Sequence, residues 1–264
     1  MTNRCQKRVW YRCSPETRTA DPFRWAVYLI ILPKVITGVR SFDSIFETVM
    51  AISALFDALL STLFPDRCGG CARFGDLLCR DCRAGLRPYP RDPGRLLDSL
   101  DDVRIAFVFA SPLREVVHQF KYRRVRRLAR PLGQLMATHL AARPLPIDAV
   151  LPVPLHHARL AERGFNQAEA LAQEVARALE RPMAAGLERV RVTEQQAHLN
   201  ARQRADNVRG AFRWRNAPPP PRLLIVDDVL TTGATIGACA EALRAAGADF
   251  VYGLALARSR PDRS

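Results

Sequence analysis

The chain has 264 residues, of which 48% are hydrophobic, and it carries a formal net charge of +14. This hydrophobic fraction is high enough for a sizeable core, which excludes a wholly disordered protein. No apolar run approaches the roughly 20 residues that a membrane-spanning helix needs, so we expect no integral membrane span.

Arginine supplies most of the positive charge, because only Lys7, Lys34 and Lys121 are lysines among the 40 basic residues. Guanidinium groups bind phosphate through a planar fork of donors, so the composition suits a nucleotide or nucleic-acid partner. A genome whose base composition favours Arg and Ala codons would give the same bias. Phosphate binding therefore has to be argued from particular sites.

Residues 1–44 differ from the rest of the chain, since they show no sustained hydrophobic period. Two interpretations stay open: a poorly ordered N-terminal arm, or an extension that exists only because the start codon was misassigned and translation begins at Met50. We favour the second. No secretory signal starts at Met1, so we expect a reducing, cytoplasmic compartment.

The second predicted region, residues 45–94, begins with an amphipathic helix. Its apolar positions alternate in steps of four and three residues, which places them on one helical stripe: Ile45, Val49, Ile52, Phe56, Leu59 and Leu63. Pro65 ends this helix just before the first of four clustered cysteines. We expect the stripe to pack on a neighbouring part of the protein.

The four clustered cysteines form two CxxC pairs, Cys68/Cys71 and Cys79/Cys82. In a reducing compartment this spacing indicates a metal site more often than disulfides, and four thiolates suit tetrahedral Zn²⁺. A closed four-thiolate site is structural, so we assign it no catalysis. Ala72 stands where a glycine often follows such a pair.

The third region, residues 95–264, alternates predicted strands with predicted helices. We expect strands at 103–110, 149–153, 223–226 and 250–257, and helices around 118–122, 168–179 and 235–246. This alternation is typical of an α/β domain, in which helices cover both faces of a parallel sheet.

The most specific motif follows the predicted strand 223–226 and reads Asp227-Asp228-Val-Leu-Thr231-Thr232-Gly233-Ala234-Thr235. Backbone N–H groups at the start of the next helix, together with Thr hydroxyls, would form a nest for a phosphate dianion. Two carboxylates beside an anion site suit the hydroxyls of a sugar, or a bridging Mg²⁺. The motif therefore predicts a cradle for a ribose 5-phosphate.

This motif resembles the binding motif for phosphoribosyl pyrophosphate (PRPP) in type I phosphoribosyltransferases. Those enzymes displace pyrophosphate from C1 of PRPP with a nitrogen nucleophile and use Mg²⁺. The resemblance implies that Asp227 and Asp228 hold the ribose hydroxyls and act in catalysis. It also implies that the loop binds the 5-phosphate through Thr231, Thr232, Gly233, Ala234 and Thr235.

Residues 52–258 narrow the resemblance to the ComF family, which couples a zinc ribbon to a type I phosphoribosyltransferase-like domain and is associated with natural competence. The segments that carry it include Phe120-Lys121-Tyr122, the stretch Val153–Gln167, Arg189-Val-Arg191-Val-Thr193, Gln196, Leu199, Arg204, Asn207 and Phe212. Arg123 and Arg124 stand where such chains often have a glycine.

Other charged residues extend the predicted site. Arg159 and Arg163 follow a strand end and would hold the pyrophosphate, which needs cations nearby. Lys121 is the last lysine of the chain, and we expect it on a phosphate, although a chance surface lysine stays an alternative. Residues 189–212 lie where this fold has a flexible lid, and Arg191 would contact PRPP from it. Other residues of the segment would contact pyrophosphate or the acceptor: Thr193, Gln196, Arg204 and Asn207. An ordinary amphipathic helix is the alternative for this segment.

The sequence therefore predicts a PRPP-binding phosphoribosyltransferase-type protein, with structural Zn²⁺ and with Mg²⁺ accompanying PRPP, that works with DNA and competence proteins. One alternative is a single-stranded DNA-binding protein without turnover, because a basic run lies beside two aromatic residues. That set is Phe120, Tyr122, Arg123, Arg124, Arg126, Arg127 and Arg130. A PRPP-sensing regulator is the other alternative.

Overall fold

A computed structural model describes residues 65–90, 98–191, 207–215 and 218–259, all of which belong to one compact unit. The predicted N-terminal extension, the predicted helix over 45–63 and the predicted boundary near residue 94 lie outside these residues. So do Thr193, Gln196 and Arg204 of the predicted lid. No helix in the described part of the chain is both long and apolar enough to cross a bilayer.

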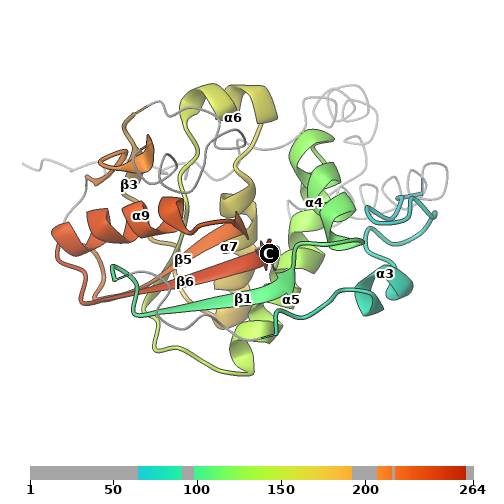
Figure 1. Cartoon of the computed structure of the whole chain (residues 1–264), viewed down its shortest axis with the longest axis horizontal. Coiled ribbons are helices and arrows are strands. Elements are labelled where there is room, and N and C mark those ends of the chain that lie inside the picture. Colours follow the sequence, from blue (N-terminus) through green and yellow to red (C-terminus); the bar gives the residue numbers. More distant parts are fainter. Residues whose placement is uncertain (1–64, 91–97, 192–206, 216–217, 260–264) are drawn as a thin grey trace, which may run out of the picture. The chain divides into compact units, whose positions relative to one another are not determined.

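Helices and strands alternate over most of the described chain, as the sequence predicts (Figure 1). In chain order the elements are α3 (Arg80–Ala84), β1 (Asp102–Val108), α4 (Leu113–Tyr122), the 3-10 turn η3 (Arg126–Leu128), α5 (Ala129–Ala141), β2 (Ala149–Pro152), α6 (His157–Arg163), α7 (Gln167–Leu179), β3 (Leu187–Arg189), β4 (Phe212–Trp214), β5 (Arg222–Leu230), α9 (Ala234–Ala245) and β6 (Phe250–Arg258).

Four strands form a parallel sheet in the order β1-β6-β5-β2, which confirms the predicted α/β class. Side chains of β5 alternate between its two faces. Leu224 and Val226 pack into a core shared with α4, α5 and α7, whereas Leu223 and Ile225 pack into a second core with α9. Helices therefore cover both faces of the sheet (Figure 1).

Strand β5 is longer than the apolar run predicts. It pairs with β6 as far as Leu230, so Asp227 and Asp228 lie within the strand and do not follow it. The neighbour on the other side, β2, ends at Pro152 opposite Val226. The acids thus lie beyond the end of β2 while the β6 ladder still holds their backbone.

The sequence pattern does not predict the short elements α3 and η3, the helices α5 and α6, or the two-stranded antiparallel pair of β3 and β4. The pair joins Arg189 to Phe212 across the segment predicted as a lid. Phe212 packs on the same core as α9. Both ends of the segment are therefore anchored on one face of the sheet.

Candidate functional site

The two acids of β5 have different surroundings. Asp228 is 8% exposed, and its Oδ1 accepts a hydrogen bond from Lys121 Nζ on α4 at 2.8 Å. Asp227 Oδ1 accepts from the Asp228 backbone N–H at 2.8 Å. Burial, and then repulsion from the Asp228 carboxylate, raise the pKa of Asp227 to about 7, although Lys121 opposes this rise. Asp227 can therefore exchange a proton near neutral pH.

The loop after β5 leads directly into the N-terminus of α9. Gly233 precedes the helix with φ +87°, a left-handed backbone conformation that a residue with a Cβ adopts only at a cost. The Thr232 hydroxyl accepts from the Ala234 backbone N–H at 3.3 Å. A helix N-terminus that begins this way presents N–H donors and a partial positive charge to an anion.

The acids and this loop share one cavity of about 140 Å³. Every residue of the motif Asp227–Thr235 lines it, so the structure brings together the predicted sugar and phosphate binders. Its other lining residues are Val153, Pro154, Leu155, Arg159, Arg163, Asn166, Gln167, Ala168 and Arg189.

Three arginines give the cavity its positive wall. Arg159 and Arg163, which the sequence analysis assigned to the site, come from α6, and Arg189 comes from the end of β3. Burial, and then the nearby Arg159, lower the pKa of Arg189 from its ordinary value. A cationic wall of this kind would favour a ligand with several negative charges.

The N-terminus of α7 adds polar groups to the same wall. The Asn166 side chain accepts from the Ala168 N–H and donates to the Val153 carbonyl, so it joins the helix to the end of β2. Gln167 is 1% exposed, and its Oε1 accepts from Arg163 Nη1 at 3.0 Å. Its Nε2 has no hydrogen-bond partner among the described residues, which leaves a buried donor for a ligand.

Two predicted binders lie elsewhere. Lys121 does not line the cavity, and its ammonium bonds to the Asp228 carboxylate. Arg191 does not line it either, because its guanidinium donates to the backbone carbonyls of Asn207 and Arg209. Arg189, two residues earlier, lines the cavity instead. The sequence predicts a basic segment here, but which of its arginines reaches the cavity depends on how β3 pairs with β4.

His156 precedes α6 and caps its N-terminus. It is 6% exposed, and its Nδ1 accepts from the Ala158 N–H at 3.3 Å. Burial, followed by the positive groups of His157, Arg189 and Arg159, lowers its pKa. The ring is therefore neutral at neutral pH and acts as a helix cap.

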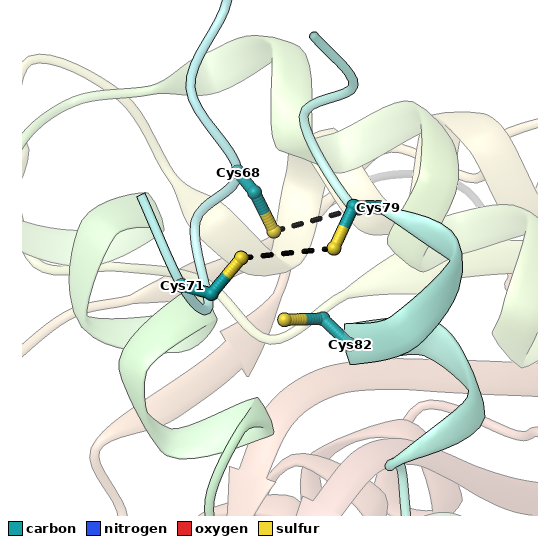
Figure 2. Close-up of side chains that lie close together, drawn as sticks. All are labelled: Cys68, Cys71, Cys79 and Cys82. Carbon is teal, nitrogen blue, oxygen red and sulfur yellow. Dashed lines mark hydrogen bonds between the residues drawn. The ribbon is translucent and has the colours of Figure 1, made fainter. Parts of the chain in front are cut away.

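The second candidate site is the predicted metal centre. All four predicted ligand atoms, the Sγ of Cys68, Cys71, Cys79 and Cys82, lie within 4.8 Å of one another. Figure 2 shows them pointing toward a common centre, with Cys71 and Cys79 Sγ 3.7 Å apart. Thiolates that bind one tetrahedral zinc at about 2.3 Å lie about 3.8 Å apart. The four cysteines could therefore hold a metal ion such as zinc.

Backbone groups support this donor set. Burial would raise the pKa of Cys68, but N–H groups of Cys79, Cys71 and Gly70 have the larger combined effect and lower the pKa to about 6. Burial and the neighbouring thiols instead raise the pKa of Cys82. At Gly70 a Cβ would lie 2.8 Å from Cys82 Sγ, so only glycine leaves room for that thiol. Ala72 adopts φ +60°, the conformation for which a glycine is usual here.

Comparison with known proteins places the chain in a family. No family model matches it. It is 33% identical over 196 residues to competence protein F of Haemophilus influenzae, which covers 69% of this chain and 84% of that protein. It is 35% identical over 200 residues to DNA utilization protein YhgH of Salmonella typhi, which covers 73% and 83%. A shorter match, 32% over 111 residues, joins it to competence protein ComFC of Streptococcus pneumoniae and covers 40% and 46%. Identity and coverage of this extent show that the chain belongs to the ComF family.

Proposed function

We propose that the cavity binds PRPP and that the protein is of the phosphoribosyltransferase type. The observation that carries the proposal is the shared cavity: an acid pair, an anion-binding helix N-terminus and three arginines line the same space of about 140 Å³. A ligand that joins a diol to two separate anionic groups matches this arrangement. PRPP is such a ligand.

Each part of the ligand has a matching group. The 5-phosphate would lie at the start of α9, against the N–H groups and hydroxyls of residues 231–235. Asp227 and Asp228 would accept hydrogen bonds from the ribose hydroxyls. The pyrophosphate would lie against Arg159, Arg163 and Arg189, with the Gln167 amide as a further donor.

The same groups would assist transfer. When the C1–O bond to pyrophosphate breaks, positive charge develops on the ribose and negative charge on the leaving group. The carboxylates of Asp227 and Asp228 would stabilise the first charge and the arginines the second. Mg²⁺ would arrive on the phosphate oxygens of the ligand, as this ion usually does, and would neutralise part of their charge.

We further propose that the protein serves competence or DNA utilization, because the relatives named above carry those functions in their names. A strain that lacks the protein should then take up or use external DNA less well. Restoration by the wild-type gene, and not by a gene that encodes Asp228→Asn, would connect this role to the cavity.

Calorimetric titration of the full chain with PRPP and Mg²⁺ tests binding. Asp228→Asn should weaken binding about 10- to 100-fold, since it removes charge-assisted hydrogen bonds worth roughly 1.5–3 kcal/mol. Glu241→Gln is the matched control, because it removes one carboxylate from the exposed side of α9. Equal affinity in wild type, Asp227→Asn and Asp228→Asn would contradict the assignment.

Single-stranded DNA binding is a second candidate, favoured by one surface feature. The Tyr122 side chain is 60% exposed beside the exposed residues Arg123 and Arg126. The predicted platform is smaller than expected, however: Phe120 is fully buried, and Arg127 pairs with Asp66. Binding at this surface should fall steeply with salt, should weaken in Tyr122→Ala and should persist in Asp228→Asn, whereas PRPP binding should require Asp228.

A further inference from the structure

The last turn of α4 contacts both sides of the proposed binding cavity. On the acid side, Lys121 Nζ lies 2.8 Å from Asp228 Oδ1, and the two side chains are only 18% and 11% exposed. On the cationic side, the Arg163 guanidinium lies over the ring of Tyr122, 5.8 Å from its centroid. Neighbouring residues of one helix thus reach the two groups that would bind opposite ends of the ligand.

Two more contacts hold the cationic side. The ring of Phe120 meets that of Phe165 edge to face, with centroids 5.4 Å apart. Just after the helix, Arg124 donates to the Glu162 carbonyl at 2.6 Å. The end of α4 therefore supports the turn between α6 and α7, which carries Arg163 into the cavity wall.

An earlier turn of α4 packs on the cysteine segment (residues 65–86). Gly69, between the first two cysteines, lies so close to α4 that an added Cβ would come within 3.5 Å of the Val116 backbone and 3.3 Å of the Leu128 side chain. Cys68 and Cys82 belong to the same core cluster as Val116 and Phe120. A metal bound by the four thiolates would contribute folding free energy to a segment this short and would hold it in place against α4.

We infer that α4 links the four-cysteine centre to the cavity, and that Lys121 is a positioning residue that holds Asp228 for the ligand. The functional meaning of the link rests on the proposed PRPP site. When the metal orders the cysteine segment, that segment fixes Val116 and Leu128, and α4 then places Lys121 against Asp228. Loss of the metal would release the acid from its partner.

The choice of residue supports this role. The chain uses arginine at 37 of its 40 basic positions, and yet the residue that reaches Asp228 is a lysine. An ammonium group is a compact point charge, whereas a guanidinium fork would need more room beside the acid pair. Without the ammonium, two adjacent carboxylates would repel each other in a largely buried site.

Hydrogen exchange of the ligand-free protein tests the link without depending on PRPP. Lys121→Met should speed exchange several-fold in the peptide over residues 226–235, and removal of zinc with a chelator should do the same in the wild type. Because both changes act through one contact, zinc removal should add little in Lys121→Met. Leu128→Ala should give an intermediate increase, since it loosens the packing of η3 and α4 on the cysteine segment without changing a cysteine. The peptide over 238–245 serves as the control, because its buried side chains pack in the second core, which contains no residue of the cysteine segment.

Unchanged exchange at 226–235 in Lys121→Met, or effects of zinc removal and Lys121→Met that simply add, would overturn the link. Circular dichroism checks that each variant is folded. PRPP titration is a separate arm, in which Lys121→Met should weaken binding about tenfold and Lys121→Arg should restore part of the loss. A wild type that binds no PRPP, with exchange as expected, would refute the proposed function and leave the link intact.

Discussion

Asp227→Asn should make the ligand-free protein more stable while it weakens PRPP binding. Asp227 has a pKa of about 7, against an ordinary value of 3.8, because burial and the Asp228 carboxylate disfavour its charge. The folded state therefore binds a proton more tightly than the unfolded state. Between about pH 4 and pH 7 the folded protein loses stability as pH rises, and the penalty is complete above pH 7.

The size of this penalty follows from the pKa. A pKa shift of one unit corresponds to about 1.4 kcal/mol, so the upper limit of the stability penalty is about 4 kcal/mol. Asp227 keeps some contact with solvent, which reduces the effect, and we expect about 1–3 kcal/mol at pH 8. Asparagine retains an oxygen that can accept from the Asp228 N–H, so this local hydrogen bond is kept.

Denaturant unfolding at pH 5 and pH 8 measures the effect. The free energy of unfolding of Asp227→Asn should exceed that of wild type, by a margin that grows by roughly 1–2 kcal/mol from pH 5 to pH 8. Glu241→Gln should show no such growth. A variant that is less stable than wild type at pH 8, or a margin that does not change with pH, would refute this reasoning.

Three further predictions concern the cysteine segment and α4. Ala72→Gly should stabilise the protein by about 0.5 kcal/mol in thermal unfolding, because Ala72 has φ +60°; destabilisation would contradict this. Gly70→Ala should weaken zinc binding at least about tenfold in chelator competition, because its Cβ would lie 2.8 Å from Cys82 Sγ; unchanged affinity would argue against the centre. Phe120→Ala should lower the free energy of unfolding by about 3–5 kcal/mol and Tyr122→Ala by less than about 1 kcal/mol, since only Phe120 is buried; equal losses in urea unfolding would contradict the burial of Phe120.

Apolar runs explain why most of the sheet is predictable from the sequence. The four apolar residues 223–226 indicate a buried strand, and the structure confirms it. The helix α5 is not predicted, because Pro131 and Gly133 are poor helix formers. Its helical partner explains the glycine: a Cβ on Gly133 would lie 2.4 Å from the Glu174 Cβ of α7. This glycine is required by the close crossing of α5 and α7, and a local sequence pattern carries no information about that crossing.

The candidate site shows the same division between local and long-range information. The motif Asp227–Thr235 is contiguous, so one strand and one helix start suffice to place it on a cavity. The partner of Lys121 is 107 residues away in the chain, and the choice of Arg189 over Arg191 depends on pairing between β3 and β4. These contacts are set by tertiary packing. The sequence alone therefore predicts that basic residues lie near the site, but not which of them line the cavity.

A crystal structure of the complex with PRPP and Mg²⁺ would test the central claim most directly. The account predicts that the 5-phosphate lies against the backbone of residues 231–235, with the ribose hydroxyls within hydrogen-bond distance of Asp227 and Asp228 and the pyrophosphate on the three arginines. A ligand bound away from the end of β5, or a phosphate on the acid side of the cavity, would contradict it.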